Sequence, residues 1–246
     1  MKKKIYIDAG HNYSSFNTGA LGNGMREQDI TFDVSFYLGE ILKRHGFDIR
    51  LSRPTLQTNL GNPNLPSLQE RNASAINARW QEANAWGADY FISIHANAGG
   101  GSGAETLFAR NEDRAFAQTV QDVYSAIMGL RNRRIWQRQD IAVIRWTTMP
   151  AILLELAFID ALPTAPDVDI LRNRRYEMAV GVAKGMLAYF GVDYCEKPTP
   201  ANQANYWAQT AQKKAMSKGI TDGLRPQHPA TREELWVMFD RLGLLG

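Results

Sequence analysis

Short apolar runs alternate along the chain with longer stretches in which apolar residues recur at helical spacing. Six runs have the β-branched and aromatic composition of strands and are bounded by polar or glycine-containing turns: 4–7, 47–51, 90–95, 104–109, 141–146 and 151–156. Four stretches carry the helical period: 26–44, 67–86, 113–128 and 174–190. Because strands and helices mostly alternate, we predict an α/β fold with a mostly parallel twisted sheet and helices on both faces.

Three segments between these elements are rich in glycine, proline or asparagine. Residues 19–24 are glycine-rich and lead into the first predicted helix. Residues 54–67 hold four prolines or glycines and three asparagines, which predicts a long exposed loop of a kind that is often functional. Residues 99–103 predict a flexible turn.

The composition changes after the last of these helices. Residues 195–204 contain two prolines and predict a linker between a domain at 1–194 and a small helical unit at 205–246. Within the small unit a turn at 219–223 separates two helices, and a capping box at 231–234 opens the second of them.

Composition and charge narrow the class of protein. The chain of 246 residues is 44% hydrophobic and 22% charged. Its net charge of +3 suits an anionic surface such as a cell wall, or equally serves solubility alone, and it is far from the charge of a nucleic-acid-binding protein. The single cysteine, Cys195, excludes an intramolecular disulfide and a four-cysteine metal site. No apolar run reaches transmembrane length, so we expect no membrane insertion. Only three apolar residues follow the three lysines at 2–4, so we expect cytoplasmic synthesis without an ordinary signal peptide.

Four titratable side chains are predicted to meet at one edge of the sheet. His11 follows the first strand, His95 and Glu155 end two later strands, and Glu27 opens the first helix. The carboxyl ends of parallel strands form the edge where open α/β sheets bind ligands. Hydrolytic zinc needs three protein ligands and one open position, which His11, Glu27 and His95 would provide. Glu155 would then accept the proton of a metal-activated water.

Each of these residues also has an ordinary structural interpretation. A histidine at a strand end is often only hydrogen-bonded, and a glutamate that opens a helix is often only a cap. A carboxylate beside a core strand, such as Glu155, is harder to explain structurally, because burying it unpaired costs several kcal/mol. Taken together, the four residues favour a functional site. The other two histidines, His45 and His228, are interpreted as structural.

Eight ordered sequence blocks resemble the zinc-dependent N-acetylmuramoyl-L-alanine amidases of the Amidase_3 family. The blocks lie at 7–11, 19–20, 26–27, 51–53, 67–71, 91–98, 103–106 and 149–155. The resemblance implies that His11, Glu27 and His95 bind zinc and that Glu155 is the catalytic acid/base. Three positions depart from the family pattern: Ala157 and Arg134 replace common glycines, and Ala161 replaces a common asparagine.

The resemblance implies hydrolysis of the amide between the lactyl group of N-acetylmuramic acid and L-alanine in peptidoglycan. Asn97 follows the second zinc histidine and could hydrogen-bond substrate, although it could equally be a turn former. The loop 54–67 and the turn 99–103 could line the substrate groove. A non-catalytic wall-binding protein and a zinc hydrolase of another bond specificity are the alternatives.

The small C-terminal unit resembles a single S-layer-homology repeat, on residues 207–208, 219–223 and 231–234. This resemblance implies binding to wall polysaccharide, with Arg232 as a candidate anion contact or simply a residue of the capped helix. A unit of this size is near the limit of independent stability, so it could also pack on the catalytic domain or form a homo-oligomer. The arrangement resembles that of a phage endolysin or a bacterial autolysin, which implies action on the cell wall after release.

Overall fold

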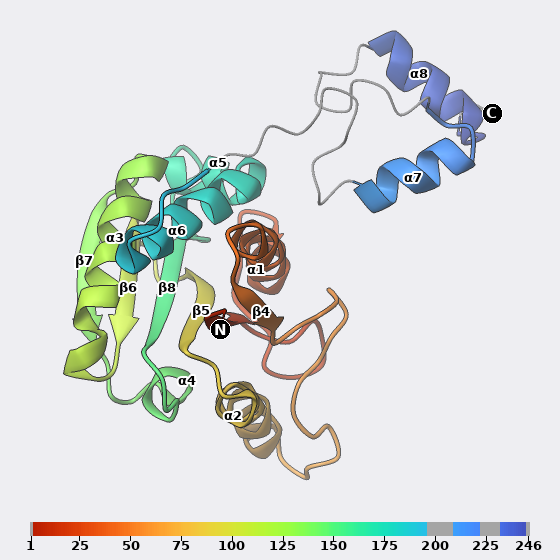
Figure 1. Ribbon diagram of the computed structural model, residues 1–246. Helices are drawn as coiled ribbons and strands as arrows, with labels where there is room; N and C mark the ends of the chain where they lie inside the picture. The colour runs from red at the N-terminus through yellow and green to blue at the C-terminus, as the bar shows by residue number, and fades with distance from the viewer. Residues whose placement is uncertain (1, 196–208, 222–231, 245–246) are drawn as a thin grey trace. The chain divides into compact units, whose positions relative to one another are not determined.

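The computed structural model describes residues 2–195, 209–221 and 232–244. Its internal contacts divide the chain into two compact units, Met1–Tyr194 and Cys195–Gly246 (Figure 1). In the second unit the described helices are α7, Gln209–Ser217, and α8, Arg232–Arg241. Almost all of the predicted linker at 195–204 and the side chains of the predicted capping box lie outside the described residues. The assignment of the unit at 205–246 to wall binding therefore stays a prediction.

The first unit is built around one six-stranded sheet. Its strands, in spatial order, are β4 (Asp48–Leu51), β1 (Lys4–Ala9), β5 (Tyr90–Asn97), β8 (Ala151–Phe158), β6 (Ala104–Phe108) and β7 (Asn132–Gln137). The first four strands are mutually parallel, whereas β6 is antiparallel to β8 and β7 is parallel to β6. The mostly parallel sheet predicted from the sequence is confirmed.

Helices cover both faces of this sheet (Figure 1). One face packs against α1 (Glu27–Arg44), α3 (Arg114–Met128), α5 (Pro166–Asn173) and α6 (Arg175–Phe190). The other face packs against α2 (Leu68–Trp86) and the single turn α4 (Ala142–Arg145). Alternate residues of a strand enter opposite cores: Ile92 and Ile94 enter the core with α1, and Phe91 enters the core with α2. No helix among the described residues has the length and apolar content needed to span a membrane.

The strand predicted at 141–146 is wrong, because this segment forms the helix α4. Its apolar pair, Val143 and Ile144, is buried in the core under α2, which a helical turn achieves as well as a strand. The sheet position beside β6 belongs instead to β7, which the sequence did not predict. This edge strand is mostly polar, and only Ile135 of it packs into the core on the α1 side.

Four short elements were also missed because each is too short to show a period. They are the hairpin β2 (Leu21–Gly22) and β3 (Met25–Arg26), the 3₁₀ turn η1 (Asn111–Asp113), and α5.

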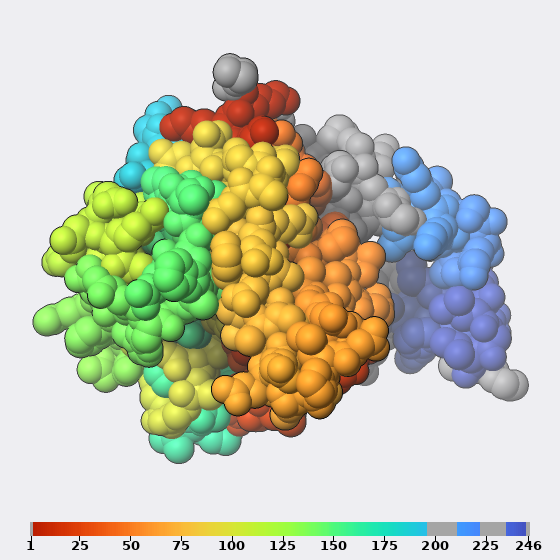
Figure 2. Space-filling view, turned by 90° about the horizontal axis from the view of Figure 1, so that it is seen from below, coloured from red at the N-terminus to blue at the C-terminus, as the bar shows by residue number. Residues whose placement is uncertain are grey.

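The long loop at 54–67 is free of regular structure, as predicted, but it is tied to the rest of the unit. Leu60 exchanges two hydrogen bonds with the side chain of Asn12, and the backbone N–H of Asn62 donates to Ser74 Oγ. Figure 2 shows this loop in orange beside α2. These contacts hold it close to the residues that follow β1.

The turn at 99–103, predicted to be flexible, is anchored by two carboxylates. Asp160 Oδ2 accepts hydrogen bonds from the N–H groups of Gly99, at 2.7 Å, and Gly100, at 3.1 Å. Asp167, which is fully buried, accepts hydrogen bonds from Ser102 Oγ and from the N–H of Gly103. The turn is therefore held in one conformation beside the end of β8.

Arg134 occupies a strained position in β7. Its φ of 75° lies in the left-handed region, and the register between β6 and β7 shifts at this point. Such a conformation costs a non-glycine residue of the order of 1–3 kcal/mol. We expect Arg134→Gly to raise the free energy of unfolding by about 1 kcal/mol and Tm by about 2–4 °C. Calorimetry of the two proteins checks this, and a lower Tm in the variant would contradict it.

Candidate active site

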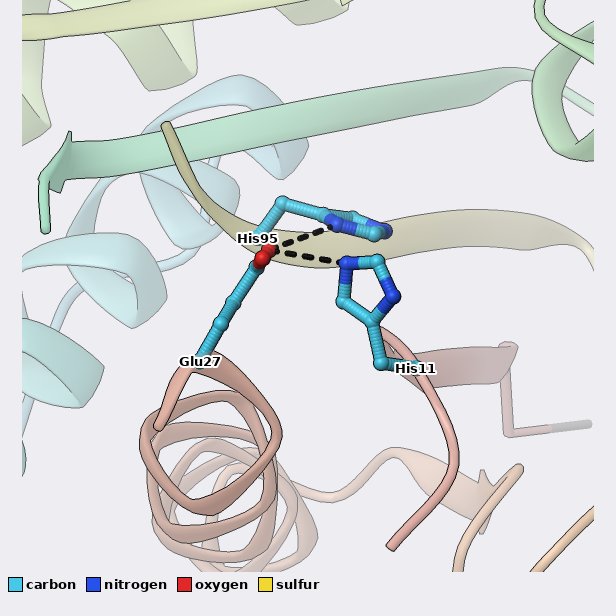
Figure 3. A group of neighbouring side chains, drawn as sticks. All are labelled: His11, Glu27 and His95. Carbon is cyan, nitrogen blue, oxygen red and sulfur yellow. Dashed lines mark hydrogen bonds and ion pairs between the residues drawn. The ribbon is translucent and has the colours of Figure 1, made fainter. Parts of the chain in front are cut away.

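His11, Glu27 and His95 converge at the carboxyl ends of β1 and β5 (Figure 3). Glu27 Oε1 lies 3.0 Å from His11 Nε2 and 3.0 Å from His95 Nδ1. One ligand atom from each of the three residues lies within 4.8 Å of the others. Three side chains separated by as many as 84 positions in the sequence are thus brought to one point.

The backbone around these residues is shaped to hold them. His11 has a φ of 66°, which turns the chain sharply after β1, and the N–H of Gly10 donates to the carbonyl of Ile94. Glu27 is the first residue of α1, and its carboxylate accepts hydrogen bonds from the N–H groups of Ala20 and Ala96. These bonds fix the direction of the Glu27 side chain before any ligand binds.

Gly10 is required by the close approach of β1 to His95. A Cβ atom at residue 10 would lie 2.5 Å from His95 Cε1 and 2.7 Å from the carbonyl oxygen of Ile94. We expect Gly10→Ala to displace the imidazole of His95 and to lower the affinity of this cluster for a divalent metal such as zinc about 10–100-fold, as loss of a supporting contact typically does. Zinc titration measures this.

Gly39→Ala, in the middle of α1, is the matched control, because its backbone is helical and a Cβ atom there would meet only side-chain atoms, the nearest at 3.3 Å. This control variant should keep the zinc affinity of the wild type. Equal zinc affinity in Gly10→Ala and the wild type would show that His95 tolerates the added carbon.

The charge states of the three residues suit metal binding. Burial alone would raise the pKa of Glu27, but hydrogen bonds from His11 and His95 hold it well below the ordinary value, so the carboxylate stays ionised. Burial lowers the pKa of His11, which favours the neutral imidazole. Burial also opposes the charged form of His95, but Glu27 outweighs this effect and raises its pKa. Metal binding therefore requires the loss of at most one proton from these three residues, the proton on His95.

The donor set fits zinc. Two imidazole nitrogens and one carboxylate oxygen are typical of catalytic zinc sites, which keep a fourth position open. Two ligands that each lie about 2.0–2.1 Å from a tetrahedral zinc are roughly 3.3 Å apart, close to the 3.0 Å separations between Glu27 and the two histidines. His11 faces the cluster through its Nε2 atom, which lies next to Glu27. Its other ring nitrogen, Nδ1, is buried without a hydrogen-bond partner among the described residues.

Glu155 lies next to this cluster in the sheet. It is paired in register with His95 on β5 and with Glu105 on β6, so the three side chains share one face of the sheet. Its Oε2 atom is buried and has no hydrogen-bond partner among the described residues. Burial, together with repulsion from Glu27 and Glu105, raises the pKa of Glu155 to about 7, although His95 opposes the shift. A carboxyl group with a pKa near neutrality can both accept and return a proton.

The sequence profile of the N-acetylmuramoyl-L-alanine amidase family, Amidase_3, matches residues 5–188. The chain belongs to this amidase family. It is 31% identical over 201 residues to the sporulation-specific N-acetylmuramoyl-L-alanine amidase of Bacillus subtilis, with 77% of this chain and 69% of the relative covered. It is 32% identical over 171 residues to the endolysin of Bacillus phage SPP1, with 65% of this chain and 56% of the endolysin covered.

Solved amidase structures share the fold. The catalytic domain of the amidase CwlV from Bacillus (Paenibacillus) polymyxa var. colistinus has a TM-score of 0.63 and 28% identity, with 78% of this chain and 99% of that chain covered. The amidase CwlD from Clostridioides difficile has a TM-score of 0.70, with 78% of this chain and 100% of that chain covered. Its 23% identity supports the fold alone.

A buried ion pair, which was not predicted from the sequence, lies next to the cluster of His11, Glu27 and His95. Asp8 and Arg79 form a salt bridge, and both side chains are almost completely buried. Ser93 Oγ donates to Asp8 at 2.7 Å, and Arg79 also donates to the carbonyl of Ala9. This network joins β1, β5 and α2 directly below the turn that carries His11. An aspartate inside an otherwise apolar strand was the available signal.

A second buried arginine, Arg53, donates to the carbonyl of Gly10 in the same turn, at 3.4 Å. It donates to the carbonyls of Gln28, at 2.9 Å, and Leu56, at 2.6 Å. It therefore connects the first turn of α1 with the start of the long loop. Its place in the sequence block 51–53 could have indicated this role.

Asn97 and Glu105 interact next to Glu155. Asn97 Nδ2 donates to Glu105 Oε1 at 2.8 Å, and Arg133 Nε donates to Glu105 Oε2 at 2.8 Å. Asn97 Oδ1 also accepts a hydrogen bond from the N–H of the next residue, Ala98. Glu105 was missed as a site residue, although it lies in one of the amidase-like blocks.

The remaining candidates lie away from the cluster. His45 ends α1, and its Nδ1 is 2.8 Å from the carbonyl of Ile41, which fits a structural role. Ala157 and Ala161, which replace common family residues, are both buried in the core on the α1 side and displace none of the four site residues. His228 and the side chain of Arg232 lie outside the described residues.

Proposed function

We propose that this peptidoglycan amidase is zinc-dependent, with His11, Glu27 and His95 as the metal ligands and Glu155 as the catalytic acid/base. The bond that it hydrolyses joins the lactyl group of N-acetylmuramic acid to L-alanine. One observation carries the proposal. A buried carboxylate oxygen of Glu155, which has no hydrogen-bond partner in the part of the chain that the structure describes, lies beside three side chains with the donor set of a catalytic zinc site.

The residues of the chain divide the work of hydrolysis. When bound, a zinc ion supplies a Lewis acid that polarises the scissile carbonyl and lowers the pKa of water toward about 7. Glu155 takes a proton from the attacking water as the new C–O bond forms. It then gives a proton to the nitrogen of L-alanine as the C–N bond breaks, which leaves a lactyl carboxylate and a free amine. A pKa of about 7 suits both transfers.

Asn97 and Glu105 support this chemistry from the neighbouring strands. Glu105 is held by Asn97 and Arg133, and its negative charge raises the pKa of Glu155. We infer that Asn97 belongs to the substrate site mainly by fixing Glu105, with a direct contact to substrate as the alternative.

We also propose that the second unit attaches the amidase to the wall. Its expected ligand is wall polysaccharide, with Arg232 as an anion contact, and self-association through this unit is the alternative. Pull-down of the full chain with purified walls, with and without Arg232→Ala, tests the first role, and sedimentation tests the second. The relatives include both an endolysin and a sporulation-specific amidase, so we propose wall lysis in one of these two settings.

Digestion of purified peptidoglycan tests the proposed reaction. The wild type should release stem peptides with new L-alanine N-termini and leave intact glycan strands, as read by mass spectrometry. Chelation should abolish the reaction, zinc should restore it, and the metal content of the active protein should be one zinc ion per chain. Cuts within the peptide or release of acetate would instead indicate a different hydrolase, and no cleavage would indicate a wall-binding protein.

A further inference from the structure

The positive charge of the chain is concentrated at one edge of the sheet. Residues 131–138, which contain β7, hold four arginines and no acidic residue, a net charge of +4. Since the whole chain carries +3, all other residues together sum to −1. This segment therefore makes a basic edge on a chain that is otherwise close to neutral.

The basic edge lies near Glu155. β7 is the outermost strand and is paired with β6, which is paired in turn with β8. Glu105 stands opposite Glu155, and the bulge that contains Arg133 and Arg134 stands opposite Glu105. The distance between this bulge and Glu155 is two strand spacings, or about 10 Å.

Among the described residues, Arg134 makes a hydrogen bond through its backbone alone: its N–H donates to Asn132 Oδ1. Its side chain is exposed and makes no hydrogen bond or ion pair among the described residues, whereas Arg133 is bound to Glu105 and Arg138 to Asp140. Its backbone is also strained, with a φ of 75°. An exposed arginine held in a conformation that glycine would adopt without strain suggests a function for the side chain.

Trp136 adds an apolar surface to the same edge. Its side chain is 54% exposed, while its Nε1 donates to the carbonyl of Arg133 at 3.2 Å, which restrains the ring. It is paired with Leu107, which is paired with Leu153, two residues before Glu155. Because strand residues alternate between faces, Trp136 lies on the face of the sheet that carries Glu155.

We propose that this edge binds the stem peptide of peptidoglycan, with Arg134 contacting a peptide carboxylate and Trp136 packing against aliphatic parts of the peptide. The inference rests on the proposed function. The acetylated sugars of the glycan are neutral once the lactyl group is in the amide, so the carboxylates of the substrate are in the peptide. A stem of three to five residues spans roughly 10–18 Å when extended, enough to reach from Glu155 to β7.

Two matched soluble substrates test the proposal. One is N-acetylmuramoyl-L-alanyl-D-glutamyl-lysine with free carboxylates, and the other is the same compound with both carboxylates converted to amides. The wild type should cleave the acid with a kcat/KM about tenfold above that of the amide. Arg134→Gln should remove this preference, mainly through KM, and Arg134→Lys should keep part of it. Trp136→Ala should raise KM for both substrates.

Two further variants separate contact from charge and from stability. Arg138→Gln removes one positive charge from the same edge, but Asp140 already holds that guanidinium, so the preference of the wild type should remain. Arg134→Gly should lose the preference even though it is more stable than the wild type. Loss of function together with a gain in stability would exclude partial unfolding as the cause.

The outcomes distinguish the inference from the proposed function. If the wild type cleaves neither compound nor whole peptidoglycan, the proposed function fails. If the wild type cleaves acid and amide equally well, or Arg134→Gln keeps the preference, the inference fails and the amidase assignment stands. If Arg134→Gln binds whole walls less well only while their anionic phosphate polymers are present, those polymers occupy the edge and the stem-peptide proposal is overturned.

Discussion

Replacing Glu155 with glutamine is expected to lower kcat on peptidoglycan about 10³-fold, within the range of about 10²–10⁴-fold that general acid–base groups contribute. Glutamine keeps the shape of the side chain but cannot exchange a proton. The zinc affinity and KM should change little, because Glu155 is outside the three-ligand cluster. Release of L-alanine N-termini over time measures kcat, and zinc titration measures the affinity.

The pH dependence gives a second readout for the same residue. A base must be deprotonated to act, so kcat of the wild type should fall as the pH drops through the pKa of Glu155. That pKa is about 7 without metal, and a bound cation would lower it. Glu105→Gln removes one of the charges that raise the pKa, so it should move this acidic limb to lower pH.

Glu105→Gln is also the control for Glu155→Gln, because it changes a neighbouring carboxylate that is already held by Asn97 and Arg133. It should retain most of the activity at neutral pH. Equal activity of Glu155→Gln and the wild type would eliminate Glu155 as the acid/base, whereas loss of zinc from that variant would mean that Glu155 acts as a ligand.

Replacing Asp8 with asparagine is expected to lower the free energy of unfolding by about 3–5 kcal/mol, because it leaves the buried charge of Arg79 without its partner. For a chain of this size the loss corresponds to a fall in Tm of roughly 6–20 °C. The exposed Asp48→Asn is the control, and its stability should stay within about 0.5 kcal/mol of the wild type. Thermal and urea unfolding measure both variants.

The stability of the wild type should also depend on pH through Asp8. Burial alone would raise the pKa of Asp8, but Arg79 and the hydroxyl of Ser93 outweigh it and lower the pKa. A carboxyl group whose pKa is lower in the folded state stabilises the fold above its unfolded pKa of about 3.9, and this contribution is lost as the pH falls further. The difference between wild type and Asp8→Asn should therefore shrink below about pH 4. A difference that stays constant there would show that Asp8 is not ionised in the folded state.

Much of the site was predictable because its residues follow strongly patterned strands. His11, His95 and Glu155 come at or near the ends of apolar strands, and parallel strands bring their carboxyl ends to one edge of a sheet. Glu27 was identifiable because it opens a long amphipathic helix that follows a glycine-rich segment. In such cases the local pattern and the fold class together determine the position of the side chain.

Residues that act through long-range contacts were not predictable in this way. Arg79 lies within a helix and gives no local sign that its charge will be buried against Asp8, 71 positions earlier. β7 was missed because an edge strand packs on one side only, so its sequence is largely polar. Val143 and Ile144 were assigned to a strand because a short apolar run fits a buried helix and a buried strand equally well.

The sequence by itself determined the α/β class, the four candidate catalytic and metal-binding residues, and the resemblance to the amidase family, since these depend on local periodicity and on ordered motifs. Only the tertiary structure decided that Glu155 stands between His95 and Glu105, that Asp8 and Arg79 support the turn of His11, and that β7 brings Arg134 to within two strands of Glu155. The physical reason is that strand order and register arise from the packing of the whole sheet, and no short stretch of sequence contains that information.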